Sequence, residues 1–214
     1  MRIIQIILIL SGIWACLPLQ AGSLTAQLFD DKHAPLPDAV VYLMSGQPYT
    51  PATVNDVEIE QKDKMFHPFV TIIPTGTIAS FPNRDGIGHH VYSFSPAKNF
   101  QLPLSDKELT ETITFDKPGI VTVGCNIHDW MVAYIYVVDT PYYAKSDANG
   151  LAVINNLPAG DYEIHVAHPG MRSAQPITRQ ANITADGESR QEFSLEIKPR
   201  YFWQPAPRMH EEVY

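Results

Sequence analysis

Cysteine, positive charge and helical periodicity are all scarce in this sequence of 214 residues. Two cysteines are too few for a disulfide-rich scaffold. The 15 lysines and arginines are outnumbered by 23 acidic residues, and the net charge of −8 argues against nucleic acid or an anionic membrane surface as a partner. Few stretches show helical spacing, whereas 18 prolines, 10 tyrosines and many β-branched residues favour short strands joined by turns.

Long apolar runs are also missing, apart from one at the N-terminus. Arg2 gives a short basic start, Ile3–Leu10 and Ile13–Leu17 are apolar, and Ala21 is a small residue suited to cleavage before Gly22. The run is too short and too interrupted to span a bilayer comfortably. Residues 1–21 are therefore predicted to be a signal peptide that exports the protein to the periplasm. No transmembrane span is expected after its removal.

The two cysteines have different expected fates. Cys16 lies inside the predicted signal, and its acylation in a lipoprotein is an alternative, against which the bulky Trp14 argues. Once residues 1–21 are removed, Cys125 is the one thiol left, so no intrachain disulfide can form. An exposed thiol in an oxidising compartment is a liability. Metal coordination is a common way to hold such a sulfur as a protected thiolate.

One short stretch carries three side chains that bind transition metals. Cys125, His128 and Met131 have two residues in each gap, and they lie between Ile120–Val123 and Val132–Val138, which read as strands. We therefore expect the three side chains in one loop at the end of a sheet.

A second imidazole is available from a distant strand. His89 and His90 open an apolar, aromatic run that could lie beside the loop in a folded sheet. Two His, one Cys and one Met are the ligand set of a blue-copper electron-transfer centre.

Strand-forming runs separated by turn residues continue through the chain. They are expected at Ser23–Phe29, Ala39–Met44, Val57–Glu60, Phe66–Ile73, Thr77–Phe81, His89–Phe94, Lys98–Leu104, Glu111–Phe115, Ile120–Gly124, Val132–Asp139, Tyr142–Lys145, Leu151–Ile154, Tyr162–Ala167, Ala181–Thr184 and Arg190–Ile197. Strands at this spacing predict an all-β fold built on an antiparallel Greek-key sandwich or barrel. Tyr92 and Phe94 are expected to fill its core.

The segment from about Val57 to Asp139 resembles the cupredoxins, the family of plastocyanin and amicyanin. The matching positions are Phe66-x-Pro68, Gly76, Phe81-x-Asn83-x-Asp85, His89-x-Val91 and Cys125-x-x-His128-x-x-Met131. The segment is also similar to exported plastocyanin-type proteins that are labelled methylamine utilisation protein. The resemblance implies one type 1 copper centre with His89, Cys125, His128 and Met131 as its ligands.

One position departs from that pattern. Plastocyanin-like proteins commonly carry Asn directly after the first ligand His, where this sequence has His90. The side chain of His90 should point to the opposite side of the strand from that of His89. We therefore expect His89 to be the ligand, with Asn83, His90 and Trp130 as candidate supporting residues around the site. The reversed assignment of His89 and His90 stays open.

The flanks resemble a second family. Ser23–Met44 and the segment from Asp147 to Tyr162 are similar to the opening and closing parts of carboxypeptidase-regulatory-like β-sandwiches. This resemblance implies a discontinuous sandwich of residues 22–48 and 140–198, an inserted cupredoxin domain of residues 49–139, and a tail of residues 199–214. The alternative is one continuous sheet shared by both units.

The predicted function is single-electron transport in the periplasm. Four protein ligands leave copper no open position, which argues for a carrier between a donor and an acceptor redox protein and against an enzyme. The sequence shows no nucleophile beside a base and no H-E-x-x-H helix. One alternative is a copper-binding accessory protein that stores or delivers the metal, and another is a structural sandwich with an unfilled loop. A monomer is expected.

Overall fold

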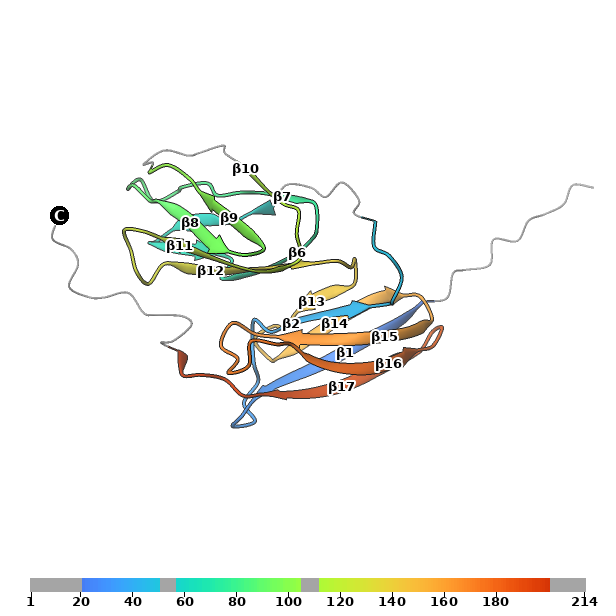
Figure 1. Ribbon diagram of the computed structural model, residues 1–214. Helices are drawn as coiled ribbons and strands as arrows, with labels where there is room; N and C mark the ends of the chain where they lie inside the picture. The colour runs from blue at the N-terminus through green and yellow to red at the C-terminus, as the bar shows by residue number, and fades with distance from the viewer. Residues whose placement is uncertain (1–20, 51–56, 105–111, 201–214) are drawn as a thin grey trace, which may run out of the picture.

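The computed structural model describes residues 21–50, 57–104 and 112–200 (Figure 1). The secondary-structure elements named in these ranges are all β-strands, as the many β-branched and aromatic residues predict. The all-β class is therefore confirmed. No helix in the described part of the chain is long and apolar enough to cross a membrane. The predicted signal peptide, including Cys16, and most of the predicted tail lie outside the described ranges.

Seven strands from the two ends of the described chain form a unit that we call the flanking sandwich. They are β1 (Gly22–Asp30), β2 (Val40–Met44), β13 (Tyr143–Lys145), β14 (Leu151–Leu157), β15 (Gly160–Ala167), β16 (Ile177–Ile183) and β17 (Glu188–Leu195). One sheet has the order β14-β1-β17 and the other has the order β13-β2-β15-β16. Along β1, the side chains of Leu24, Ala26 and Leu28 alternate inward and are fully buried.

Ten strands of the described chain, between those two groups, form the central unit. They are β3 (Val57–Glu58), β4 (Glu60–Lys62), β5 (Met65–His67), β6 (Val70–Pro74), β7 (Thr77–Ser80), β8 (Val91–Ser95), β9 (Lys98–Gln101), β10 (Thr112–Phe115), β11 (Gly119–Cys125) and β12 (Val132–Val138). One sheet has the order β6-β12-β11-β8-β9, a second has the order β10-β7-β3, and β4 pairs with β5. Ala79 and Phe115 of the second sheet share one core with Val123 and Ile135 of the first. The central unit is therefore a sandwich.

The expectation that Phe94 fills the core is wrong. Val91 and Ser93 of β8 are buried, whereas Phe94 is 65% exposed and Tyr92 is half-buried. Alternate residues of a strand share a face, and buried His89 lies two residues before Val91. Because Val91 and Ser93 of β8 point inward, Tyr92 and Phe94 of the same strand point outward.

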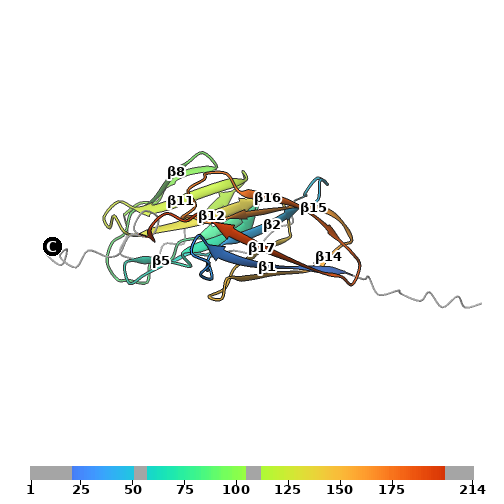
Figure 2. The same ribbon diagram turned by 90° about the horizontal axis from the view of Figure 1, so that it is seen from below.

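Packed side chains join the two units. Val70 of β6 and Tyr136 of β12 lie in the apolar core of the flanking sandwich. Lys145 donates a hydrogen bond of 2.9 Å from Nζ to the carbonyl of Val70. Figure 1 shows β12 on the side of the central unit that faces the flanking sandwich, and Figure 2 shows the two units from below, where they overlap in the view. The division of the chain at residues 49 and 139 stays a prediction, as does the resemblance of the flanks to a known family.

Candidate metal centre

Cys125 is the last residue of β11 and points into the central unit. Val121, Val123 and Cys125 share the inward face of this strand and are buried. The backbone N–H of Cys125 donates to the carbonyl of Met131 at 3.1 Å. The sulfur is therefore fixed at the point where the core ends and the loop begins.

The loop of residues 126–131 folds back over Cys125. The N–H of Asn126 donates to the carbonyl of His90 at 3.1 Å, and the N–H of Met131 donates to the carbonyl of His128 at 2.9 Å. These bonds hold both ends of the loop. The loop places Nδ1 of His128 at 3.8 Å from Sγ of Cys125, and the His128 side chain is only partly buried.

His89 approaches Cys125 from the neighbouring strand, because β8 and β11 pair through Val91 and Cys125. The His89 side chain is fully buried, and its Nδ1 lies 3.8 Å from the sulfur of Cys125. Its ring centroid is 5.0 Å from that of His128. The donor atoms of His89, Cys125 and His128 all lie within 4.8 Å of one another, which is the one such group of three or more His, Cys, Asp or Glu side chains in the described ranges.

The spacing of the donor atoms fits a single ion. Bonds of about 2.3 Å to sulfur and about 2.05 Å to nitrogen, the lengths found at zinc, separate the two donors by about 3.8 Å when the angle between the bonds is about 120°. Both sulfur–nitrogen distances in the cluster match this value. Thiolate and imidazole are ligands of soft and borderline transition metals. The cluster can therefore hold one such ion with little movement of the sulfur relative to either ring.

The fourth expected ligand, Met131, lies in the same region. Its side chain is 1% exposed and packs in the same apolar core as Cys125. Hydrogen bonds of its backbone to Cys125 and His128 tie it to the loop. Its role as an axial ligand stays a prediction.

The three residues that were expected to support the site lie around it in different ways. His90 is half-buried, and its carbonyl anchors the loop through Asn126. Trp130 is buried, with its ring centroid 5.3 Å from that of His128. Asn83 braces the turn before His89, because its Nδ2 donates to the carbonyl of Ile87 at 2.7 Å.

The structure adds a residue that sequence reasoning did not assign to the site. Oδ2 of Asp85 lies 2.7 Å from Nε2 of His89, the ring nitrogen that faces away from Cys125. Burial raises the pKa of Asp85, but hydrogen bonds from the backbone of Lys64, from His89 and from the backbone of Asp63 outweigh it and lower that pKa. An acidic residue four positions before a candidate ligand histidine was the available signal.

The cluster changes the acidity of its own members. Burial raises the pKa of the Cys125 thiol, but hydrogen bonds with His89, with two backbone groups and with His128 outweigh it and lower that pKa to about 6. Burial lowers the pKa of His89, whereas Cys125 and Asp85 raise it, and the result lies above the ordinary value. A thiol with a pKa near 6 is mostly thiolate at neutral pH, which is the form that binds metals.

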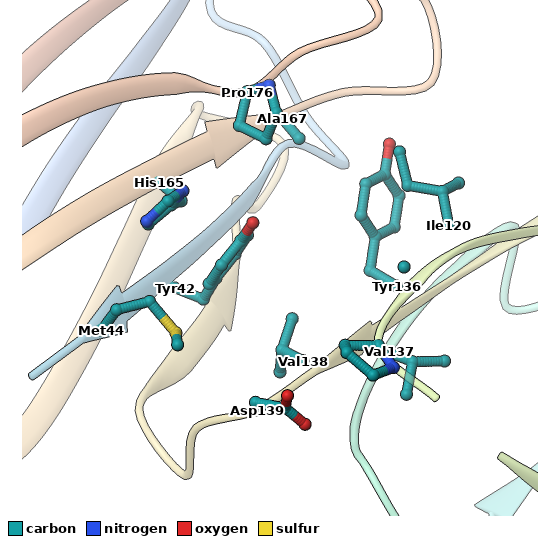
Figure 3. Close-up of a pocket in the computed structure, with 12 residues that line it drawn as sticks. Tyr42, Met44, Ile120, Tyr136, Val137, Val138, Asp139, His165, Ala167 and Pro176 are labelled. Carbon is teal, nitrogen blue, oxygen red and sulfur yellow. The ribbon is translucent and has the colours of Figure 1, made fainter. Parts of the chain in front are cut away.

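A cavity of about 360 Å³ lies elsewhere, between the two units (Figure 3). Tyr42 and His165 of the flanking sandwich and Ile120 and Tyr136 of the central unit line it. Ile120 is near the start of β11 and Cys125 is at its end, a separation of about 17 Å at about 3.3 Å per residue. The metal cluster and this cavity are therefore separate features.

No family model matches the sequence, and no curated protein matches it. Several solved structures are similar to part of the chain. A purple cupredoxin from Nitrosopumilus maritimus is 22% identical over 39% of this chain and 100% of its own, with a TM-score of 0.35. A Cu-containing nitrite reductase from Thermus scotoductus SA-01 is 25% identical over 44% of this chain and 26% of its own, with a TM-score of 0.39. A Cu(I) form of a mutant amicyanin is 17% identical over 46% of this chain and 98% of its own, with a TM-score of 0.37.

Proposed function

We propose that this protein holds one copper ion in a type 1, or blue, centre and carries single electrons between a donor and an acceptor redox protein. The observation that supports this most directly is the group of His89, Cys125 and His128, with both sulfur–nitrogen distances at 3.8 Å. Copper supplies the one-electron chemistry, and the residues of the chain fix its coordination.

The proposed ligand set leaves no position for a substrate. His89, Cys125 and His128 would hold the ion as strong donors, and Met131 would be a weak fourth donor. Catalytic metal sites keep a position open for water or substrate, whereas four protein donors close this one. The set therefore favours electron transfer over substrate turnover, and the proposal is a protein without an enzymatic reaction of its own.

The strand pairs and hydrogen bonds around the site favour fast electron transfer. Copper(II) and copper(I) prefer different geometries, so a site held between the two changes little when an electron is gained. Cys125 is held by strand pairing, and the loop is closed by hydrogen bonds of Met131 to Cys125 and His128. These fixed donors keep the rearrangement small.

The proposed route for electrons is the partly exposed ring of His128. The side chain of His89 is fully buried and Cys125 is 4% exposed. Ile127, directly before His128, is 46% exposed, so it adds an apolar contact area to the surface beside the His128 ring. A redox partner that docks on this end of the central unit comes nearest to the metal through His128.

Optical and paramagnetic-resonance spectra of the copper-loaded protein test the proposal. We expect one equivalent of copper and an intense visible absorption from thiolate to copper, which Cys125→Ser removes. A matched variant, Asn126→Ser, changes an exposed neighbour and should keep the colour. A protein that binds one equivalent of copper without visible absorption would contradict a type 1 centre.

Repeated redox cycling separates a carrier from a protein that stores or delivers copper. A carrier keeps its ion through many cycles of reduction and oxidation, so the copper content should stay constant. Loss of copper to a competing chelator on each reduction would instead indicate delivery.

The proposed location is the periplasm, which rests on residues 1–21 alone. The mass of the mature protein tests this, since cleavage before Gly22 gives an unmodified chain. A lipid-modified chain beginning at Cys16 would show anchoring instead.

A further inference from the structure

The buried carboxylate of Asp85 contacts a proposed copper ligand, His89. The Asp85 side chain is 8% exposed, and the His89 side chain with which it pairs is fully buried. Nε2 of His89 points at Asp85 over 2.7 Å, while Nδ1 of the same ring points at Cys125. The imidazole therefore lies between an anion on one side and the candidate metal position on the other.

The carboxylate is held in place from a different part of the sandwich. Oδ2 of Asp85 accepts a hydrogen bond of 2.8 Å from the N–H of Lys64, and Oδ1 accepts one from the N–H of Asp63. Both donors lie in the turn between β4 and β5 and have φ of 55°. The N–H of Asp85 donates to Oδ1 of Asn83 at 3.0 Å. The backbone of residues 63–64 therefore holds the carboxylate, and the side chain of Asn83 holds the backbone of Asp85.

Such a pair has a definite effect on a metal ligand. A histidine that binds a metal through one nitrogen commonly donates the N–H of the other to a carboxylate, which fixes the tautomer and the ring orientation and makes the ligand more basic. A more basic ligand and a fixed negative charge both favour the more highly charged oxidation state of the ion. Asp85 should therefore stabilise Cu(II) relative to Cu(I).

We propose that Asp85 is a positioning residue that keeps the proton of His89 on Nε2, presents Nδ1 to the metal and lowers the reduction potential of the copper centre. This inference rests on the proposed function. It adds to the four ligands a buried charge that sets which electron donors can reduce the protein.

Asp85→Asn removes the charge at nearly constant volume. The amide has one acceptor oxygen in place of two, and its NH₂ group cannot accept the proton of His89. Asp129→Asn is the matched control, because Asp129 lies next to His128 and is exposed to solvent. Both variants lose one negative charge near the site, but only Asp85 contacts a ring nitrogen of a proposed ligand through a buried pair.

The measurement is a redox titration of the copper-loaded wild type and both variants. For Asp85→Asn we expect at least a tenfold increase in the ratio of Cu(I) to Cu(II) at a fixed ambient potential, or about 59 mV for one electron. For Asp129→Asn we expect a much smaller change, because water and salt screen an exposed charge. A potential of the Asp85→Asn protein that moves no more than that of Asp129→Asn would overturn the proposal.

A measurement on the metal-free wild type covers the case in which Asp85→Asn does not fold. Nitrogen-15 NMR at neutral pH should show a proton on Nε2 of His89 that exchanges with solvent more slowly than the ring protons of His128. An Nε2 without a proton, or one that exchanges as fast as those of His128, would overturn the proposed role of Asp85.

These results separate the two proposals. A colourless copper-loaded wild type would contradict the type 1 centre, whereas a blue wild type with an unchanged potential in Asp85→Asn would contradict only the role of Asp85. The NMR result reports on the contact between Asp85 and His89 without copper.

Discussion

The burial of His168 in the flanking sandwich predicts that the free energy of unfolding depends on pH. This side chain is 4% exposed, and its Nδ1 accepts a hydrogen bond of 2.9 Å from the N–H of Gly170. Burial lowers the pKa of His168 to about 4, against smaller opposing effects of Asp38 and of the backbone at Pro37. A histidine in the unfolded chain has a pKa near 6.5. The unfolded chain therefore takes up a proton between these two values that the folded chain does not.

The sign and the size of the effect follow from this difference. The pKa of His168 is lower in the folded chain than in the unfolded chain. The free energy of unfolding is therefore highest above pH 6.5 and decreases as the pH falls towards 4. A difference of about 2.5 pKa units lowers the free energy of unfolding by about 3.4 kcal/mol over the whole range from well above pH 6.5 to well below pH 4. Between pH 7 and pH 5 the loss is about 2 kcal/mol. The charged groups near His168 include Asp38, which is paired with Lys145 at 3.0 Å, and Arg172 and Lys198, which line the depression beside the ring.

Chemical unfolding at pH 7 and pH 5 measures the effect. In His168→Asn, the side-chain oxygen can accept the N–H of Gly170 without titrating, so the variant should lose about 2 kcal/mol less than the wild type over this range. His33→Asn is the control, since His33 is exposed and Asn tolerates its φ of 63°. Equal losses in the wild type and His168→Asn would refute the reasoning.

Three further predictions concern the central unit. His89→Gln should abolish the thiolate-to-copper absorption whereas His90→Gln should keep it, and an optical titration with copper would show the reverse if His90 were the ligand. Met131→Leu should keep the copper and its colour but raise the reduction potential, because a weak donor that favours Cu(II) is lost; an unchanged potential in a redox titration would argue against axial coordination. Ile135→Ala should lower the free energy of unfolding by about 2–5 kcal/mol, because the side chain is fully buried, and denaturant unfolding with a loss below 1 kcal/mol would contradict this packing.

The part of the site that follows from the sequence is the part that is local in the chain. Cys125 and His128 share a loop between two strands, so their proximity depends only on where β11 ends and β12 begins. The choice between His89 and His90 depends on strand parity, which the sequence leaves open. In the fold, His89 is buried on the same side of the chain as Val91, and its Nδ1 lies 3.8 Å from Sγ of Cys125. Its role as the ligand stays a prediction.

The rest depends on contacts between distant segments. Phe94 looks like a core residue by type, but its side of β8 is decided by His89 and Val91. The contact of Asp85 with Lys64 spans 21 residues and joins the turn after Asn83 to the β4–β5 hairpin. Hydrophobic periodicity carries no information on such a contact, because it sets which side faces inward and not which turns meet.

The three donor groups owe their positions to hydrogen bonds and strand pairs that do not involve a metal. The backbone of Cys125 is bonded to Met131, the backbone of Met131 is bonded to His128, and Asn126 is bonded to His90, so the loop is closed by the chain itself. His89 is held from the opposite side by Asp85. A metal that enters this frame needs little movement of the sulfur against either ring, since the two sulfur–nitrogen distances of 3.8 Å already suit bonds to a single ion. The same rigidity that prepares the site for binding limits its rearrangement when the charge of the ion changes, which is the physical requirement for rapid electron transfer.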